Sequence, residues 1–455
     1  MTTAGATETF QTTEAAPPIR MPPGPRLPRL VQTALITVVG LPYVEWLHRR
    51  YGNAVTIRTL FGPEPGVAVF DPTLTKQLFQ GPHDQLRAGE ANSLLAPLLG
   101  QRSVIVLDGH EHMRHRRLLL PPFHGKVLQR YEQAIIDAAD AAIDGWPVGE
   151  PFTVTPSMQS LTLRVISRVI FGFAPDEAGE LIAALRAYID PIGQPRSMGA
   201  LIGAVLQRTG FAGNKRAQEF VARRDAVDDL LYAEIARRRA LPEAELAAKD
   251  DVFSTLLLAR DESGERLNDL ELRDELLTLL VAGHETTATG LAWTLDLMLH
   301  APEVHDRAKQ ADDAYLDAVF KEALRIRPVL GLVGRVVRGA PFKLGDWTLP
   351  DGTEINPWIR VIHKRADLYP EPDRFRPERF LSDDGPDTYT WVPFGGGTRR
   401  CIGAAFAATE ARLILRRILE RTELRPASPK LEEVQMRIIT LTPRNGTRVI
   451  VERKL

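Results

Sequence analysis

The feature that most limits the fold of this chain is a stretch from about residue 110 to residue 330 in which apolar residues recur at helical spacing. It predicts helices near 110–120, 126–145, 157–172, 176–190, 216–239, 268–300 and 312–327. A further segment of good helix formers, IGAAFAATEARLILRRILER, follows the cysteine at position 401. So many helices can bury their apolar stripes only against one another, which favours a helical core.

Short strands are predicted at both ends of this helical stretch. Residues 54–60 and 66–70 form an expected strand pair joined by the turn FGPEPG, and more strands are expected around 334–360 and near 435–452. No repeat and no long internal linker divides the body. The sequence therefore predicts a mostly α fold with small β-sheets. We expect one large helical domain over residues 26–455, behind a disordered Thr/Pro-rich tail at residues 1–25.

The charge balance limits the classes of partner. The chain has 57 basic and 58 acidic residues, a net charge of −1, which argues against a general affinity for nucleic acid or anionic membranes but leaves local patches open. Its best apolar run, LVQTALITVVGL, is interrupted by Gln32 and Thr33, and Pro42 follows it. A bilayer span takes roughly 20 apolar residues, so no membrane anchor is predicted. The single cysteine and the absence of a signal-like start favour the cytoplasm.

The only cysteine, Cys401, stands in FGGGTRRCIG. A lone cysteine is most often a small buried hydrophobe, but this one follows a glycine run and two arginines and precedes a predicted helix. A cationic helix N-terminus should lower the pKa of the thiol, and the glycines should let the backbone approach a flat, bulky group. The loop lacks the pattern of a phosphate loop or of a cysteine protease. A thiolate ligand for a soft or redox metal remains.

The predicted helix at 268–300 has Asn268 as its N-cap and Ala282-Gly283 near its centre, followed by Glu285 and Thr286. A glycine inside a helix costs about 1 kcal/mol relative to alanine, so it needs a reason. Close approach of a ligand and helix–helix packing explain it equally well. The zinc motif H-E-x-x-H is excluded, because position 288 is alanine.

Two more charged groups carry weaker signals. Glu322 and Arg325 are three residues apart on one helix face, and Arg379, in an extended Pro/Arg-rich stretch, could join them in a buried network. The stretch DGHEHMRHRRLLLPPF combines three histidines with arginines, which would repel a metal dication and favour an anion such as a carboxylate. Its His112 and Arg116 share a helix face, although a solvated basic face would have the same pattern.

Together these motifs resemble those of the cytochrome P450 family. FGGGTRRCIG matches the haem-binding signature F-x-x-G-x-R-x-C-x-G, AGHETT resembles the oxygen-activating segment, EALR the E-x-x-R motif, and PERF the segment whose arginine completes a triad. All four occur in the family's order, and the resemblance runs from about residue 20 to the end. The missing anchor and the 37-residue interval from Glu285 to Glu322 resemble soluble bacterial members.

The resemblance implies haem b as the cofactor, with Cys401 as its axial thiolate and iron ligand. It implies that the haem propionates are bound by four residues: His112, Arg116, Arg335 and Arg399. Glu285 and Thr286 would be the acid–alcohol pair that delivers protons during oxygen activation. Glu322, Arg325 and Arg379 would form a structural triad that holds the cysteine loop.

The implied activity is insertion of one oxygen atom of O2 into a small molecule, with electrons from NAD(P)H. Only 54 residues follow Cys401, too few for a flavin domain, so the electrons should come through a separate ferredoxin or flavodoxin and its reductase. Arginines on or near the helix after Cys401 could form a basic docking patch for that partner, namely Arg399, Arg400, Arg412, Arg416 and Arg417. The alternatives are a peroxygenase that uses hydrogen peroxide and a non-catalytic haem sensor.

The substrate pocket should be lined by residues 87–101, 190–215, 329–334 and 435–442, of which 190–215 is Gly-rich yet apolar and resembles a mobile cover. These stretches are mostly apolar, so a lipophilic substrate is expected.

Overall fold

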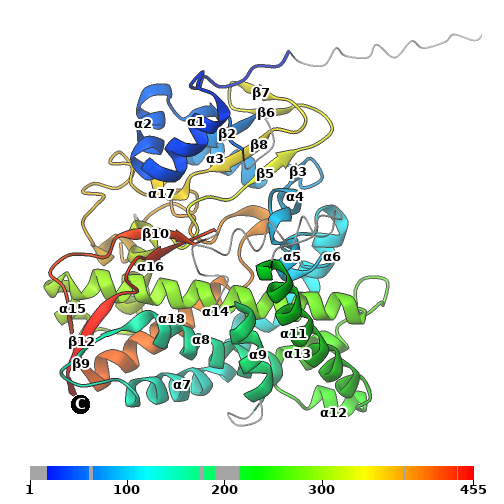
Figure 1. Ribbon diagram of the computed structural model, residues 1–455, viewed down its shortest axis with the longest axis vertical. Helices are drawn as coiled ribbons and strands as arrows, with labels where there is room; N and C mark the ends of the chain where they lie inside the picture. Colours follow the sequence, from blue (N-terminus) through cyan, green and yellow to red (C-terminus); the bar gives the residue numbers. More distant parts are fainter. Residues whose placement is uncertain (1–17, 61–64, 174–178, 190–214, 383–384, 438) are drawn as a thin grey trace, which may run out of the picture.

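The structure is a computed structural model that describes residues 18–60, 65–173, 179–189, 215–382, 385–437 and 439–455. Its centre is helical, as predicted (Figure 1). Each predicted helix overlaps an observed one: α6 (Gly109–Leu119), α7 (Glu132–Asp144), α8 (Val154–Phe171), α9 (Gly179–Ile189), α11 (Lys215–Arg239), α14 (Asp269–Leu299), α16 (Asp313–Ile326) and α18 (Ala404–Arg421).

The shorter helices were not predicted: α1 (Arg29–Ala34), α2 (Leu41–Tyr51), α3 (Pro72–Gln80), α4 (Ala88–Ala91), α5 (Ala96–Leu99), α12 (Glu243–Ala247), α13 (Val252–Leu258), α15 (Pro302–Lys309) and α17 (Ile359–Ile362). Most are too short for their periodicity to stand out from loop sequence.

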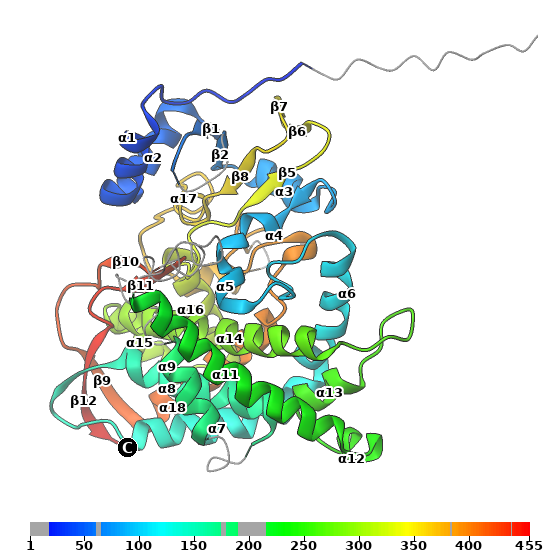
Figure 2. The same cartoon turned by 45° about the vertical axis from the view of Figure 1, so that its right-hand side comes forward.

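Helix α14 runs through the middle of the molecule (Figures 1 and 2). Asn268 is its N-cap, as predicted: the Asn268 side chain accepts from the Glu271 N–H at 3.0 Å, and the Glu271 carboxylate accepts from the Asn268 N–H at 2.9 Å. This reciprocal capping box satisfies two N–H groups that would otherwise lack partners at the helix start.

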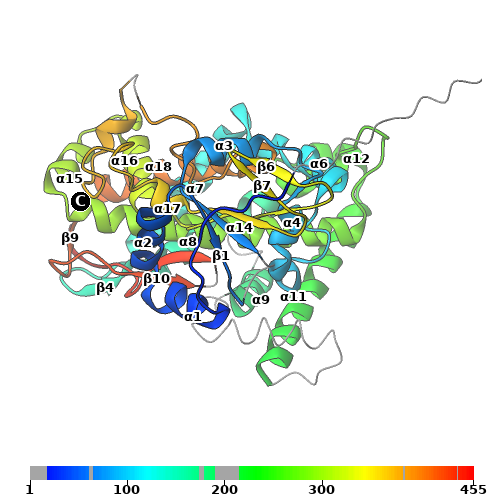
Figure 3. The same cartoon turned by 90° about the horizontal axis from the view of Figure 1, so that it is seen from above.

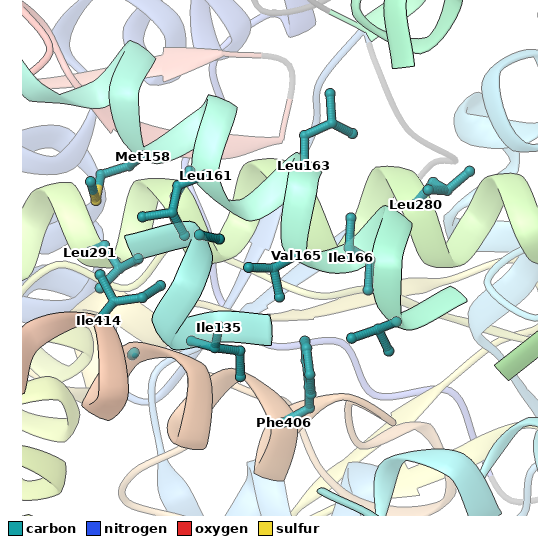
Figure 4. Packing of buried hydrophobic residues seen from close by; sticks show 14 of the residues in the cluster. Ile135, Met158, Leu161, Leu163, Val165, Ile166, Leu280, Leu291, Phe406 and Ile414 are labelled. Carbon is teal, nitrogen blue, oxygen red and sulfur yellow. The ribbon is translucent and has the colours of Figure 1, made fainter. Parts of the chain in front are cut away.

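The core forms where α8 packs between α14, α7 and α18 (Figure 4). Apolar side chains from all four helices meet there, including Ile135, Leu161, Ile166, Leu280, Leu291, Phe406 and Ile414. The core therefore fixes α14 and the helix that follows Cys401 in one packed unit.

Gly283 lies where α14 packs against Ile166 of α8. A Cβ atom at this position would lie 2.9 Å from Cδ1 and from Cγ1 of Ile166. Of the two reasons weighed for this glycine, the structure supports helix–helix packing.

The strands form small sheets, and the largest has the order β1-β2-β8-β5-β3. Its strands are β1 (Ala54–Ile57), β2 (Gly66–Val69), β8 (Glu354–Pro357), β5 (Arg335–Val337) and β3 (Leu86–Arg87). The predicted pair β1 and β2 is antiparallel, with Ala54 opposite Val69. The strand expected to reach residue 60 ends at Ile57, because the Arg58 and Leu60 N–H groups donate instead to side chains of α1.

Within the described residues three smaller sheets complete the fold, and Figure 3 labels strands of each. They pair β6 (Phe342–Leu344) with β7 (Trp347–Leu349), β10 (Val434–Arg437) with β11 (Thr440–Pro443), and β12 (Arg448–Lys454) with both β4 (Pro151–Thr153) and β9 (Thr422–Pro426).

The expectation that the disordered tail extends to residue 25 was wrong for residues 20–25, which the structure describes. Arg20 and Thr348 exchange two backbone hydrogen bonds, and the Thr56 N–H donates to the Pro23 carbonyl at 2.9 Å. Residues 20–25 thus lie against the strands. Their prolines cannot donate to a ladder, but their carbonyls still accept.

The close packing at Gly283 generates a stability prediction. Gly283→Val should lower the free energy of unfolding by about 1–3 kcal/mol, because the new side chain overlaps Ile166. Combining it with Ile166→Ala should cost less than the sum of the two single changes, since the smaller residue makes room. Urea unfolding of the four proteins measures this coupling; strictly additive costs would contradict the packing explanation.

Candidate functional site

Cys401 lies in a loop between a single 3-10 turn, η7 (Gly397–Arg399), and the start of α18. Its N–H donates to the Phe394 carbonyl at 2.9 Å, which closes the loop, and the Gly403 N–H hydrogen-bonds to the sulfur. The side chain is accessible. Burial nevertheless raises the pKa of the Cys401 thiol. The thiol is thus accessible although protein atoms surround it closely.

The expectation that the pKa of this thiol is lowered was wrong. The Gly403 N–H and the charges of Arg116 and Arg400 do favour the anion, but burial outweighs them. A stable thiolate therefore needs a cation directly at the sulfur. A coordinated metal ion meets that need, because it deprotonates the thiol that binds it.

The glycines before Cys401 let the loop pack closely against α3. Gly397 has a φ of +63°, and a Cβ atom there would lie 1.8 Å from the Phe79 carbonyl oxygen. At Gly396 a Cβ atom would lie 2.4 Å from the Phe79 ring. The two glycines thus approach Phe79 of the protein itself, Gly396 at its ring and Gly397 at its backbone.

Four cationic or basic side chains from separate elements gather near the cysteine loop: His112 and Arg116 of α6, Arg335 of β5, and Arg399 of η7. Burial, followed by the positive charges of Arg399, Arg116 and Arg335, lowers the pKa of His112 to about 3. Burial and the charge of Arg399 lower the pKa of Arg335 to about 10. The pKa of His112 thus responds to all three arginines, which places the four side chains in one cluster around this histidine.

The positive charge of this cluster is only partly compensated. Arg399 pairs with Asp108 at 2.6 Å and donates to the carbonyls of Val104 and Leu107. Within the described ranges the guanidinium of Arg116 makes no hydrogen bond or ion pair, and the buried Nδ1 of His112 has no hydrogen-bond partner. The arrangement suits an anionic ligand with carboxylate groups, and the burial of His112 and Arg335 rules out a solvated basic face.

The neighbouring residues of α6 point elsewhere. Arg114 binds Asp261 at 2.5 Å and Glu271 at 3.0 Å, while His115 contacts the buried Glu275 at 2.7 Å and Glu271 at 3.4 Å. These contacts tie α6 to the start of α14. The histidines of α6 do not converge, and the described part of the chain contains no group of three or more metal-ligating side chains.

Glu285 and Thr286 are consecutive, half-buried residues near the middle of α14. The Thr286 hydroxyl donates to the Ala282 carbonyl, one turn earlier, at 2.6 Å. Its remaining lone pairs can therefore accept a hydrogen bond from water. The Glu285 carboxylate accepts from the Gln159 side-chain amide of α8 at 2.7 Å. A proton acceptor and a hydroxyl thus stand side by side.

Glu322, Arg325 and Arg379 meet in the interior. Arg325 donates to both oxygens of Glu322, at 2.6 and 2.8 Å, and Arg379 donates to Glu322 at 3.3 Å. Glu322 and Arg325 are both 0% exposed. The two helical residues therefore form a buried bidentate pair and not a solvated surface bridge.

This pair connects to the cysteine loop through residues that the sequence analysis missed. Arg325 donates to the carbonyl of His363 at 2.8 Å, and the Nε2 atom of His363 accepts from the Val392 N–H at 2.9 Å. The Trp391 indole donates to the Lys321 carbonyl at 3.1 Å. Burial lowers the pKa of His363 to about 3, so the ring is neutral and can accept.

Asp108 and Glu410 were also missed. Asp108 is the countercharge of Arg399, and its carboxylate accepts from the N–H groups of Gly89 and Glu90 as well. Glu410 of α18 is fully buried beside Thr287, and burial raises its pKa well above the usual value. Asp108 begins the stretch DGHEHMRHRRLLLPPF and Glu410 lies in the segment after Cys401, but the sequence analysis assigned neither of them a role. An acidic residue at an apolar position of a helix, as at Glu410, is the one signal that could have been noticed.

The basic docking patch expected around α18 is largely neutralised. Arg412 lies 3.5 Å from Asp313, Arg416 pairs with the same carboxylate at 2.9 Å, and Arg417 pairs with Asp140 at 2.8 Å. Arg399 points inward to Asp108. Among the described residues Arg400 is the member of this set that is exposed without an ion pair.

The stretches expected to line a substrate pocket adjoin one another where they are described. The Leu441 N–H donates to the Val329 carbonyl at 2.7 Å, and a Cβ atom at Gly334 would lie 2.9 Å from that of Ala91. Residues 87–101, 329–334 and 435–442 are thus neighbours. The expected mobile cover at 190–215 lies outside the described residues except for residue 215.

The sequence and the fold were compared with known proteins. The family model of cytochrome P450 matches residues 21–449. A Mycobacterium tuberculosis protein named cytochrome P450 135B1 is 41% identical over 444 residues, which cover 95% of this chain and 91% of the relative. Cytochrome P450 135A1 of the same species is 38% identical over 450 residues, covering 96% of each chain.

The fold comparison agrees. The solved structure of cyanobacterial CYP120A1 with bound retinoic acid has a TM-score of 0.80 and 23% sequence identity, and the match covers 96% of this chain and all of that one. At this identity the likeness shows the fold alone. The family model and the mycobacterial relatives extend over nearly the whole sequence, and the chain therefore belongs to the cytochrome P450 family.

Proposed function

We propose that this chain is a monooxygenase that inserts one oxygen atom of O2 into a lipophilic small molecule, with Cys401 as the haem ligand. A haem with an axial cysteine thiolate supplies the activation of O2 for attack on unreactive C–H bonds. The observation that carries the proposal is the accessible thiol of Cys401 beside the buried, undercompensated cluster of His112, Arg116, Arg335 and Arg399.

These residues fit haem on two independent grounds. The metal would keep the thiol of Cys401 deprotonated, although burial disfavours a free thiolate. The two propionates would supply the negative charge that the cluster lacks, and would give partners to Arg116 and to the buried Nδ1 of His112.

Glu285 and Thr286 are proposed to move protons during turnover. The Thr286 hydroxyl already donates to Ala282, so it can hold a water molecule as an acceptor. The Glu285 carboxylate, which accepts from the Gln159 amide, can pass protons to that water. A retained acid–alcohol pair favours O2 and an electron donor over hydrogen peroxide as the oxidant. The proposed donor is NAD(P)H through a separate ferredoxin or flavodoxin and its reductase.

The apolar stretches expected to line the substrate pocket support a lipophilic substrate. Exposed apolar side chains occur on each described stretch, with Leu94 52%, Leu332 42% and Met436 61% exposed. A spectral binding screen of hydrophobic compounds, followed by turnover of the hits with NADPH, ferredoxin and ferredoxin reductase, tests the function. Turnover with hydrogen peroxide but not with the electron donors would favour the peroxygenase alternative.

The first prediction concerns Cys401. The reduced, carbon monoxide-bound protein should absorb at the long wavelength typical of thiolate ligation, and Cys401→His should shift this band to the position typical of histidine ligation. Absorption spectroscopy of freshly purified protein measures both. A histidine-type spectrum in the unchanged protein would contradict the assignment of Cys401.

The second prediction concerns the buried pair. Removing one partner of a buried ion pair costs about 3–5 kcal/mol, so Glu322→Ala should yield little haem-loaded protein. Asp306→Ala removes an exposed pair of the same i, i+3 type with Lys309 and is the matched control. Haem content and thermal unfolding are measured for both. Equal behaviour of the two variants would mean that Glu322 has no special structural role.

The third prediction concerns the proton path. Thr286→Ala should keep consuming NADPH while product formation falls and hydrogen peroxide rises, with unchanged haem content. A positioned proton-transfer group is worth about 10²–10⁴-fold, less if water substitutes for it. Thr294→Ala is the control, because Thr294 makes the same hydrogen bond to a carbonyl one turn earlier, at 2.7 Å, but lies two turns further along α14.

The measured quantity is product formed per NADPH consumed, with a substrate from the screen. Thr286→Ser, which keeps the hydroxyl, should restore most of the ratio. If Thr286→Ala and Thr294→Ala give the same ratio as the unchanged protein, the proton path lies elsewhere.

A further inference from the structure

The first helical segment of the described chain buries polar side chains and exposes several apolar ones. It consists of α1 followed by the short π-helix η1 (Leu35–Val39). Gln32 and Thr33 are 0% and 7% exposed, whereas Leu30 is 68% and Val38 84% exposed. A helix on a protein surface normally has the opposite arrangement, with its apolar face against the core.

The hydrogen bonds of the buried Gln32 and Thr33 explain why this polar face of α1 is turned toward the protein. The Gln32 amide donates to the Leu27 carbonyl at 2.7 Å, and its oxygen accepts from the Arg58 N–H at 3.1 Å. The Thr33 hydroxyl accepts from the Leu60 N–H at 3.0 Å. These contacts pair the backbone beyond the end of β1 and fix the orientation of α1. Leu30, Val31, Val38 and Val39 therefore remain exposed, while Leu35 and Ile36 pack partly against the core.

Aromatic residues continue this surface on α2. Trp46 is 42% exposed and stacks on Tyr43, with ring centroids 5.6 Å apart. It also meets Tyr51 edge-on at 5.9 Å. Tryptophan and tyrosine are the residues that favour the boundary between water and lipid. In Figures 1 and 2, α1 and α2 lie at an edge of the molecule.

The charge of this segment differs sharply from that of the whole chain. Residues 18–60 contain six arginines and one glutamate, a formal charge of +5, whereas the complete sequence has a net charge of −1. Several arginines adjoin the apolar residues directly: Arg26 precedes Leu27, Arg29 precedes Leu30, and Arg49 and Arg50 follow Trp46 by one helical turn.

We propose that the exposed face of α1, η1 and α2 docks the protein peripherally on the surface of an anionic phospholipid bilayer. The apolar side chains would enter the boundary between head groups and acyl chains, and the arginines would contact lipid phosphates. None of the described helices by itself has the length and hydropathy to span a bilayer; Arg29–Val39 and Leu41–Tyr51 reach them only when joined across a bend of 120°.

A second copy of the chain is a less suitable occupant of this face. Self-association through it would bring two segments of charge +5 together, and the repulsion opposes the gain from burying the apolar residues. Lipid phosphates instead neutralise the arginines. The proposal concerns binding alone and is independent of the proposed function.

The test is sedimentation of the full-length protein with vesicles of phosphatidylcholine alone or mixed equally with phosphatidylglycerol. We expect binding to the mixed vesicles that weakens with salt. Leu30→Ser combined with Val38→Ser should reduce it by about tenfold or more, since both apolar anchors are lost. Leu270→Ser combined with Leu455→Ser removes side chains that are 50% and 61% exposed elsewhere, and should leave binding unchanged.

The charge contribution is tested with Arg26→Gln combined with Arg49→Gln, which should also weaken binding by about tenfold or more. Lys126→Gln combined with Arg448→Gln, two exposed cations on other elements, is the matched control. Failure of the unchanged protein to bind mixed vesicles would overturn the proposal. Equal binding by the variant pairs and their controls, or dimerisation through this face without vesicle binding, would overturn it too.

Discussion

The buried ion pair between Glu322 and Arg325 is the interaction on which the rest of the site depends. Burying two charged groups away from water costs free energy unless their polar atoms all have hydrogen-bond partners. Here the guanidinium also donates to the carbonyl of His363, and the imidazole of that residue accepts from Val392, close to the cysteine loop. Glu322 and Arg325 are only three residues apart. Through these hydrogen bonds their helix also holds segments about 40 and 70 residues away in the sequence. Loss of one charge would release them together.

The sequence predicted those parts of the structure that depend on nearby residues. Helix periodicity, the cap at Asn268 and the pairing of β1 with β2 follow from local patterns, and the structure has all three. Partners that come from distant segments could not be predicted, as His363 and Asp108 illustrate. The pKa of Cys401 was predicted in the wrong direction for the same reason: adjacent cations are visible in a sequence, but burial depends on the entire fold.

The run LVQTALITVVGL shows how one pattern admits two explanations. In the sequence Gln32 and Thr33 simply interrupt an apolar stretch, and that is sufficient to exclude a membrane span. In the structure Gln32 and Thr33 are buried, whereas Leu30, Val31, Val38 and Val39 are exposed and Leu35 and Ile36 pack partly against the core. Hydropathy cannot distinguish these cases, because a buried amide with satisfied hydrogen bonds is stable in the interior. The difference arises from Arg58 and Leu60, whose N–H groups need acceptors once β1 has ended.

The contacts of Arg114 and His115 with the first turns of α14 have a consequence for motion. Glu271 caps α14 and binds both Arg114 and His115 of α6. The helix that holds His112 and Arg116 and the helix that holds Thr286 therefore share one carboxylate. The two helices should consequently behave as a single rigid frame. If the chain has the proposed function, any widening of the substrate entrance would have to occur through segments outside this frame. Exchange of substrate would then leave the alignment between His112, Arg116 and the Thr286 hydroxyl unchanged.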